Sequence, residues 1–220
     1  MLIRDISVEK DLFLSGFEPI GKVRRIFNRY KIQDLPIIEN GLLKGYVRAE
    51  DLIGFKEDES LENVNFLHSN AFSLTDEVHV VSCLRLLVRR QLTTCAVFNE
   101  SGNFIGTIID RYLLKEIGQK YQFGERGSVL VLSFDKSKFL VSDILRILET
   151  EGGFPIMFFS NLGEKQDEIH LTVKLQILDN QNIINSLNRF GVEILYSMEV
   201  PDYSDFLNDR YDQLIKYLDI

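Results

Sequence analysis

The chain of 220 residues contains an internal repeat, in which residues 32–47 align with residues 92–108 and the second copy has one extra residue in its turn. Upstream of each aligned segment, apolar residues recur with the spacing i, i+3, i+6, i+7, which marks one buried face of a helix. A repeat of this length indicates one structural unit that occurs twice in tandem. The helical positions are Ile20, Val23, Ile26 and Phe27 in the first copy, and Val80, Cys83, Leu86 and Leu87 in the second.

The sequence pattern of each copy predicts a helix, a strand, a tight turn, a second strand and a short helix, in this order. The turns contain Asn40 and Gly41 in the first copy and residues 99–102 in the second, and Asn and Gly tolerate the positive φ angles of tight hairpins. The closing helices are expected to begin near Ala49 and Asp110, where acidic residues suit the positive end of a helix dipole. The acidic linker, residues 55–62, is expected to be a surface connection.

Residues 127–200 follow a different pattern, β-α-β-β-α-β, which is the ferredoxin-like order. The expected strands are residues 129–134, 154–159, 169–175 and 192–196, with helices over residues 140–148 and 183–190. Residues 169–175 alternate strictly between apolar and polar, so one face of this strand should be buried and the other wet.

Residues 203–218 carry an apolar stripe at helical spacing, and predict a terminal amphipathic helix. Because such a stripe has to be buried, the helix is expected either to pack on its own domain or to form a dimer contact. The stripe consists of Phe206, Tyr211, Leu214, Ile215 and Leu218, and the opposite side carries Asp205, Asp209, Asp212 and Lys216.

The first copy reads Leu-Pro-Ile-Ile at residues 35–38, Asn-Gly at residues 40–41 and Glu-Asp-Leu at residues 50–52. In this order it resembles the CBS domain, a module that occurs in pairs known as Bateman modules. The resemblance implies one CBS motif at residues 1–56 and a second at residues 66–122. Residues 127–200 resemble an ACT domain, and the whole is similar to acetoin-utilisation-type bacterial CBS proteins. The expected fold class is therefore α+β: a CBS-domain pair, a ferredoxin-like domain and a terminal helix at residues 201–220.

The resemblance also implies a ligand site, because CBS domains hold a nucleoside with the motif Gly-x-x-Thr/Ser-x-x-Asp. In the first copy Gly45 would allow close backbone approach, and Asp51 would accept the ribose hydroxyls. Arg48 replaces the hydroxyl residue, and it either binds phosphate or fills the site. An alternative for Asp51 is a solvated carboxylate at a helix start, and for Leu35 it is core packing. The implied ligand-binding set is Asp34, Leu35, Pro36, Gly45, Arg48 and Asp51.

The second copy keeps Gly106 but loses both the hydroxyl and the carboxylate of this motif. Asp110 lies two residues early and is expected to cap the helix that follows. In the ACT-like domain the turn at residues 135–138 lacks the glycine that often marks an amino-acid site in that family. The sequence therefore predicts at most one nucleoside site, in the first copy.

Composition and motifs narrow the class of function. A formal net charge of −8 disfavours binding to nucleic acid. No stretch is long and apolar enough for a membrane span and the N-terminus does not read as a signal peptide, so a cytoplasmic location is expected. His68, His79 and His170 are scattered, and no Walker, GxSxG or GxGxxG motif occurs. We expect a homodimeric, non-catalytic sensor that binds AMP, ADP, ATP or S-adenosylmethionine; the alternative is an interaction scaffold with degenerate sites.

Overall fold

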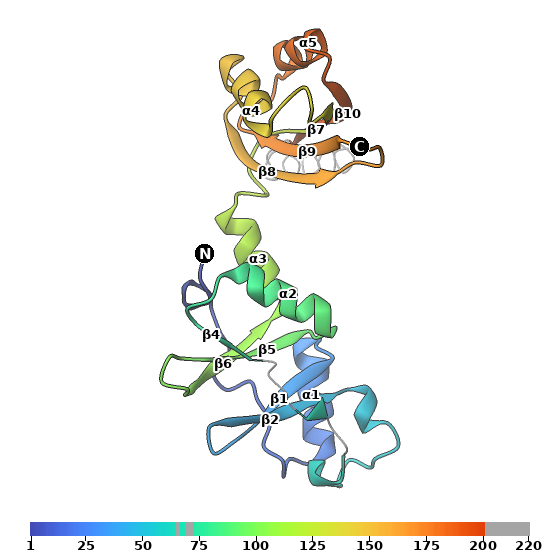
Figure 1. Cartoon of the computed structure of the whole chain (residues 1–220). Coiled ribbons are helices and arrows are strands. Elements are labelled where there is room, and N and C mark those ends of the chain that lie inside the picture. Colours follow the sequence, from blue (N-terminus) through green and yellow to red (C-terminus); the bar gives the residue numbers. More distant parts are fainter. Residues whose placement is uncertain (65–66, 69–72, 201–220) are drawn as a thin grey trace, which may run out of the picture. The chain divides into compact units, whose positions relative to one another are not determined.

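The computed structural model describes residues 1–64, 67–68 and 73–200 (Figure 1). The chain divides into two compact units, Met1–Ile117 and Gly118–Ile220. The terminal helix predicted at residues 201–220 lies outside the described residues. No helix in the described part of the chain has both the length and the apolar character needed to cross a membrane.

The predicted repeat is confirmed by the order of elements in the N-terminal unit. Each copy has a helix of 11 residues, two antiparallel strands joined by a tight turn, and a closing helix. The closing helix is a short 3-10 helix in the first copy and a full α-helix in the second. The elements are α1 (Ile20–Tyr30), β1 (Asp34–Glu39), β2 (Leu42–Arg48) and η2 (Glu50–Leu52), then α2 (Val80–Arg90), β5 (Thr94–Phe98), β6 (Phe104–Ile109) and α3 (Asp110–Lys120).

Backbone conformation repeats with the same offset. α1 and α2 end at Lys31 and Gln91, whose φ angles are 51° and 54° in the left-handed region. The turn between β1 and β2 has positive φ at both Asn40 (52°) and Gly41 (77°), as a tight two-residue hairpin turn requires. The Asn-Gly prediction is therefore confirmed by the backbone angles.

Short strands from the intervening segment complete both sheets. β3 (Leu67–His68) pairs antiparallel with β2, which gives a sheet in the order β1-β2-β3. β4 (Ser73–Thr75) pairs parallel with β5, which gives the order β4-β5-β6.

The segment that precedes each copy packs into the core of the other copy. In η1 (Ile3–Asp5), the Ile3 amide donates to the Val78 carbonyl at 3.0 Å, and Ile3 is buried with residues of α2. In η3 (Leu61–Asn63), the Leu61 amide donates to the Glu18 carbonyl at 2.9 Å, and Leu61 is buried with residues of α1. The linker was expected to lie on the surface, but Leu61 is 0% exposed, because its side chain completes the first copy's core.

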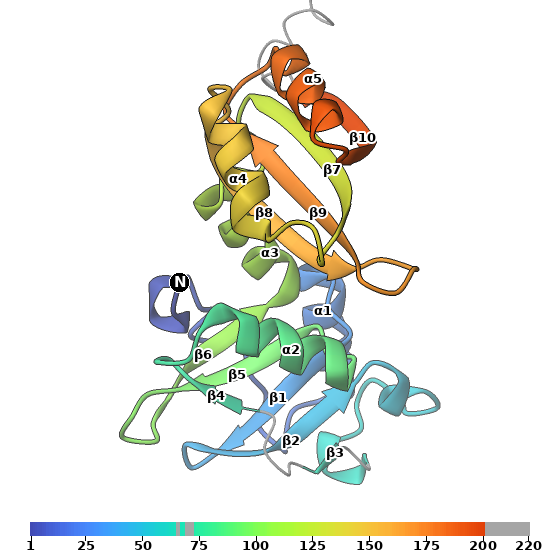
Figure 2. The ribbon, with the colours of Figure 1, turned by 45° about the horizontal axis from the view of Figure 1, so that its top comes forward.

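The C-terminal unit is a four-stranded antiparallel sheet in the order β10-β7-β9-β8. α4 and α5 lie together on one face of this sheet (Figure 2). This arrangement confirms the predicted β-α-β-β-α-β order and the α+β class. The elements are β7 (Gly127–Asp135), α4 (Val141–Thr150), β8 (Pro155–Leu162), β9 (Glu168–Leu175), α5 (Gln181–Arg189) and β10 (Glu193–Val200).

Lys174 lies on the face of β9 that the alternating pattern predicted to be exposed to solvent, but the structure buries it. It is only 2% exposed, because its Nζ donates to three backbone carbonyls: those of Gln122 (2.7 Å), Phe123 (2.9 Å) and Glu125 (2.7 Å). Burial lowers the pKa of Lys174. The lysine thus holds the turn between α3 and β7 against the sheet.

The hydrogen bonds to Glu168 predict that the stability of the C-terminal unit falls in acid. Its carboxylate accepts from the Lys165 amide (3.1 Å) and the Ser133 hydroxyl (2.8 Å), and these bonds lower the pKa of Glu168 from 4.5 to about 2. A carboxylate whose pKa is lower in the folded state than in the unfolded state stabilises the fold at every pH above its unfolded-state pKa. This stabilisation is lost as the pH falls from the unfolded-state pKa through the folded-state pKa. We expect Glu168→Gln to flatten the fall of the denaturation midpoint below pH 4.5. A slope equal to that of the wild type would contradict this role.

Candidate functional site

A cavity of about 270 Å³ lies where β1 begins and β2 ends. We call it the Arg48 cavity. The strand register places Asp34 directly opposite Arg48, and Gln91 reaches the same place from the left-handed end of α2. Both copies therefore contribute to one site. Its lining consists of Gln33, Asp34, Arg48, Glu50 and Gln91.

Asp34 is 1% exposed, and its carboxylate binds the second copy through four hydrogen bonds. Its Oδ2 accepts from the Thr93 amide (2.6 Å) and hydroxyl (2.7 Å), and its Oδ1 accepts from the Thr94 amide (3.0 Å) and hydroxyl (2.8 Å). Burial raises the pKa of Asp34 more than these hydrogen bonds lower it. The carboxylate is thus mainly a connection between the two copies.

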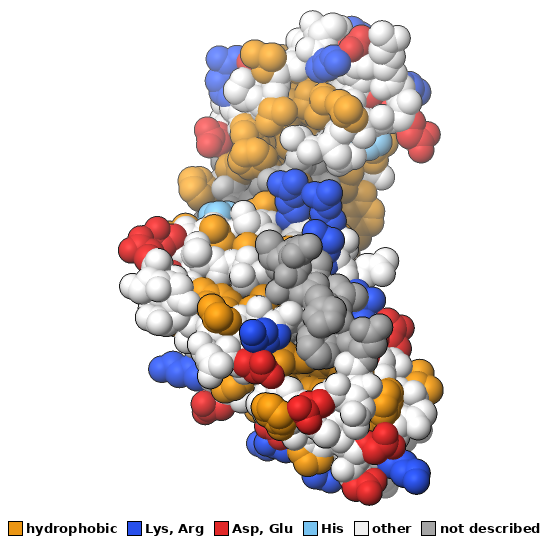
Figure 3. All heavy atoms as spheres, turned by 60° about the horizontal axis from the view of Figure 1, so that its bottom comes forward, with side chains coloured by type: hydrophobic (Ala, Val, Ile, Leu, Met, Phe, Trp, Pro, Cys, Tyr) orange, Lys and Arg blue, Asp and Glu red, His pale blue; other side chains and the backbone are white. Residues whose placement is uncertain are grey.

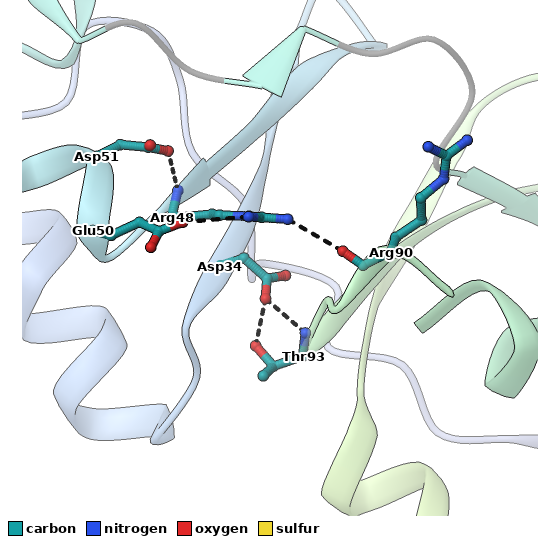
Figure 4. A network of polar contacts seen from close by, with 6 residues as sticks. All are labelled: Asp34, Arg48, Glu50, Asp51, Arg90 and Thr93. Atoms are coloured by element: carbon teal, nitrogen blue, oxygen red, sulfur yellow. Dashed lines mark hydrogen bonds and ion pairs between the residues drawn. The ribbon is translucent and has the colours of Figure 1, made fainter. Parts of the chain in front are cut away.

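The Arg48 side chain crosses above Asp34 towards the second copy (Figure 4). One terminal nitrogen lies 3.3 Å from a Glu50 carboxylate oxygen, and the other donates to the Arg90 carbonyl at 3.2 Å. Both distances exceed the 2.7–2.9 Å typical of charge-assisted bonds. The buried Nε has no hydrogen-bond partner among the described residues. The guanidinium therefore retains capacity to bind an acceptor.

Of the predicted site residues, Asp34 and Arg48 line the Arg48 cavity, and four others lie outside its lining. Asp51 is next to it, since its Oδ2 accepts from the Arg48 amide at 2.8 Å and stabilises the turn into η2. Leu35 is 0% exposed in the first copy's core. Pro36 is buried and its carbonyl accepts from Leu14, and Gly45 is buried in β2 between β1 and β3.

Sequence reasoning missed three lining residues, Gln33, Glu50 and Gln91, and the bonds from Thr93 and Thr94 to Asp34. The repeat offset contains a signal for these bonds, because residues 33 and 34 correspond to residues 93 and 94. In the structure the Gln33 amide also donates to the Thr93 hydroxyl at 2.9 Å. Equivalent residues of the two copies thus contact each other directly.

The second copy has a different residue at the position of Arg48. Ile109 pairs with Thr94 as Arg48 pairs with Asp34. Ile109 is 1% exposed and packs in the first copy's core. An apolar side chain therefore occupies the position from which a guanidinium enters the Arg48 cavity.

The C-terminal unit has a cavity of about 680 Å³ along α4 and α5, which includes Lys138 from the turn after β7. Its polar groups bind one another: the Ser186 hydroxyl contacts Glu151 (2.5 Å) and accepts from Arg189 (2.6 Å). Within the described ranges, no cluster of three His, Cys, Asp or Glu residues is suited to a metal ion. We therefore take the Arg48 cavity as the candidate site.

Comparison with known proteins gives a family match for the first copy. Residues 3–58 match the CBS domain family. An uncharacterised protein of Methanocaldococcus jannaschii is 23% identical over 106 residues, which are 48% of this chain and 40% of that protein. The chain thus matches less than half the length of this curated relative.

Two of the solved structures that resemble the chain are described here by their fold. One is a CBS domain pair/ACT domain protein from Thermotoga maritima, with 18% identity, a TM-score of 0.47, and coverage of 55% of this chain and 98% of that one. The other is a CBS domain pair in complex with 5′-methylthioadenosine and S-adenosyl-L-methionine. It has 17% identity and a TM-score of 0.43, with coverage of 55% and 98%.

Proposed function

On the premise that this chain contains a CBS domain, repeated as a second copy of the same elements, we propose that it is a non-catalytic regulatory protein. Its ligand is an adenosine-containing nucleotide bound in the Arg48 cavity. The observation that carries the proposal is the position of Arg48, which lines the cavity and whose guanidinium makes two long contacts within the described part of the chain.

The chemistry of the lining matches the parts of a nucleotide. The Arg48 guanidinium is a forked donor for phosphate oxygens. The Glu50 carboxylate, exposed at the rim, accepts hydrogen bonds from ribose hydroxyls. Gln33 and Gln91 offer amides that both donate and accept, as the edge of a base requires. A volume of about 270 Å³ is just below the usual range for ligand pockets, so AMP is the first candidate.

Regulation requires that the ligand bind two states of the protein unequally. The lining of the cavity supports unequal binding to two states, because it comes from both copies. Arg48 also contacts the Arg90 carbonyl of the second copy in this structure. A phosphate that takes over the guanidinium would release this contact and change how the copies are held. The expected homodimer and cytoplasmic location belong to the same proposal.

The ligand test is a comparison of unfolding free energy with and without nucleotide. AMP, ADP, ATP and S-adenosylmethionine are added separately, and a ligand at 100 times its dissociation constant should stabilise the fold by about 2.7 kcal/mol. Arg48→Met should remove this stabilisation, because methionine keeps the length and loses the donors. Asp51→Ala should reduce it, because the turn that presents Arg48 loses its acceptor. Arg89→Met, an exposed position on α2, is the control and should respond as the wild type does.

An absence of stabilisation by all four compounds would reject the nucleotide proposal. The alternative, a protein-interaction scaffold with degenerate sites, would then be favoured. Its support is Ile109, which fills the equivalent position of the second copy with a buried apolar side chain.

A further inference from the structure

The cavity of the C-terminal unit is lined by one side of α4 and one side of α5, which lie together on the sheet (Figure 2). Its lining residues recur with the spacing i, i+3, i+4, i+7 along α4 and i, i+3, i+4 at the end of α5, and this spacing places each set on one side of its helix. The volume of about 680 Å³ lies within the usual range for pockets that bind small molecules. The residues are Asp143, Arg146, Ile147 and Thr150 on α4, and Ser186, Arg189 and Phe190 on α5.

Three cationic side chains line this α4–α5 cavity and have donors available for a ligand. The Lys138 ammonium makes no hydrogen bond or ion pair with a described residue. Arg146 is 78% exposed and reaches Asp143 at 3.4 Å, which is longer than a typical charge-assisted hydrogen bond. Arg189 donates from one terminal nitrogen to the Ser186 hydroxyl at 2.6 Å, and its other nitrogens contact no acceptor among the described residues.

The two carboxylates of the lining already accept hydrogen bonds from the protein. Asp143 accepts from the Leu140 amide at the start of α4 (3.0 Å) and from Arg146, and Glu151 accepts from the Ser186 hydroxyl. The available groups of the cavity are therefore mainly positively charged donors. Such a site favours an anion over a cation, and it favours a simple anion over a compound that also carries an ammonium group.

Apolar side chains lie in the same lining. Phe139 and Ile147 are half-buried, and Phe190 is 56% exposed. On the surface of this unit, at the top of Figure 3, Lys and Arg side chains also lie beside hydrophobic ones. A ligand that matches both parts of the lining has an apolar body and an anionic group.

We propose that the α4–α5 cavity binds a small organic anion, with an apolar body and one carboxylate or phosphate group. The apolar body packs against the aromatic and aliphatic side chains, and the anionic group binds the ammonium and guanidinium groups. The contacts among Ser186, Glu151 and Arg189 hold the Arg189 side chain in place before the ligand binds, which lowers the entropy cost of binding. This site lies within the C-terminal unit and does not depend on the nucleotide proposed for the Arg48 cavity.

Titration of the full chain with matched compounds tests the proposal. 3-Phenylpropanoate is an apolar anion, L-phenylalanine adds an ammonium group to it, and 2-phenylethylammonium carries only the positive charge. The amides of α4 and α5, followed by ¹H–¹⁵N NMR, should shift with 3-phenylpropanoate at a dissociation constant several-fold below that for L-phenylalanine. They should not shift with the cation. Phenyl phosphate should shift the same amides, and the two affinities then identify the preferred anionic group.

Lys138→Met and Lys136→Met are matched variants, because both lysines are exposed on the turn after β7 and only Lys138 is part of the lining. Lys138→Met and Arg146→Met should each weaken binding of 3-phenylpropanoate about two- to fivefold, as the loss of one exposed charge pair predicts. Lys136→Met should bind as the wild type does.

Three results would overturn the proposal. The first is that neither 3-phenylpropanoate nor phenyl phosphate shifts the amides of α4 and α5. The second is that 2-phenylethylammonium or L-phenylalanine binds there as tightly as 3-phenylpropanoate. The third is that the Lys138 and Lys136 variants bind the anion equally well.

Discussion

Asp34→Ala is expected to lower the unfolding free energy of the N-terminal unit by about 3 kcal/mol. The carboxylate is 1% exposed and accepts two amides and two hydroxyls from Thr93 and Thr94. Alanine leaves these donors without an acceptor at a place that water reaches poorly. Relief of the burial that raises the pKa of Asp34 offsets a part of this loss. Urea denaturation of the full chain, with hydrogen exchange of the β5 amides, measures the effect.

A double-mutant cycle separates the lost hydrogen bonds from a general loss of packing. Thr94→Val removes one hydroxyl that donates to Asp34. In the wild type this substitution should cost about 1–2 kcal/mol, and in the Asp34→Ala background it should cost much less. Additive costs in the two backgrounds would show that Asp34 acts independently of Thr94. Asp11→Ala, at an exposed position of the same unit, is the control.

Lys174→Met is expected to release the turn at residues 122–125. Methionine has a similar length but no donors, so the carbonyls of Gln122, Phe123 and Glu125 lose their shared partner. Since these residues are exposed, water can solvate the carbonyls, and the global loss should be about 1–2 kcal/mol. The Phe123 amide, bonded to the Gly118 carbonyl at 2.8 Å, should exchange at least roughly tenfold faster.

Lys136→Met provides the matched control for that exchange measurement. Lys136 is an exposed lysine of the same unit and pairs with Asp167 at 2.8 Å. A surface pair of this kind contributes about 0–1 kcal/mol, so neither global stability nor the Phe123 amide should change much. If the Lys174 and Lys136 variants gave the same exchange rate at Phe123, Lys174 would have no specific role in holding the turn.

Local patterns were sufficient to predict most of the fold. The repeat offset located both strand–turn–strand units, and Asn40 and Gly41 located a hairpin turn that has positive φ at both residues. The alternation in residues 169–175 placed Leu171 and Val173 in the core. These features depend on neighbours in sequence, which is why they can be recognised from the chain alone.

The features of the fold and of the candidate site that the sequence did not predict depend on contacts between residues that are distant in sequence. Asp34 is a plausible ligand residue in sequence, yet its carboxylate is bound by residues 93 and 94 of the second copy. Lys174 sits at a polar position of an alternating strand, and only the turn at residues 122–125 explains its burial. Gln91 lies at a helix end and reaches the Arg48 cavity only because the two copies face each other there.

The segment before each copy packs into the core of the other copy, and this sets the order in which the two cores of the N-terminal unit can form during synthesis on the ribosome. The first copy receives Leu61 from the segment that follows it in synthesis. The second copy needs Ile3 and Ile6, which pack against α2. At about 5–20 residues per second, these two side chains wait roughly 4–17 s until α2 has been synthesised. The first residues of the unit to be made are therefore among the last to be buried.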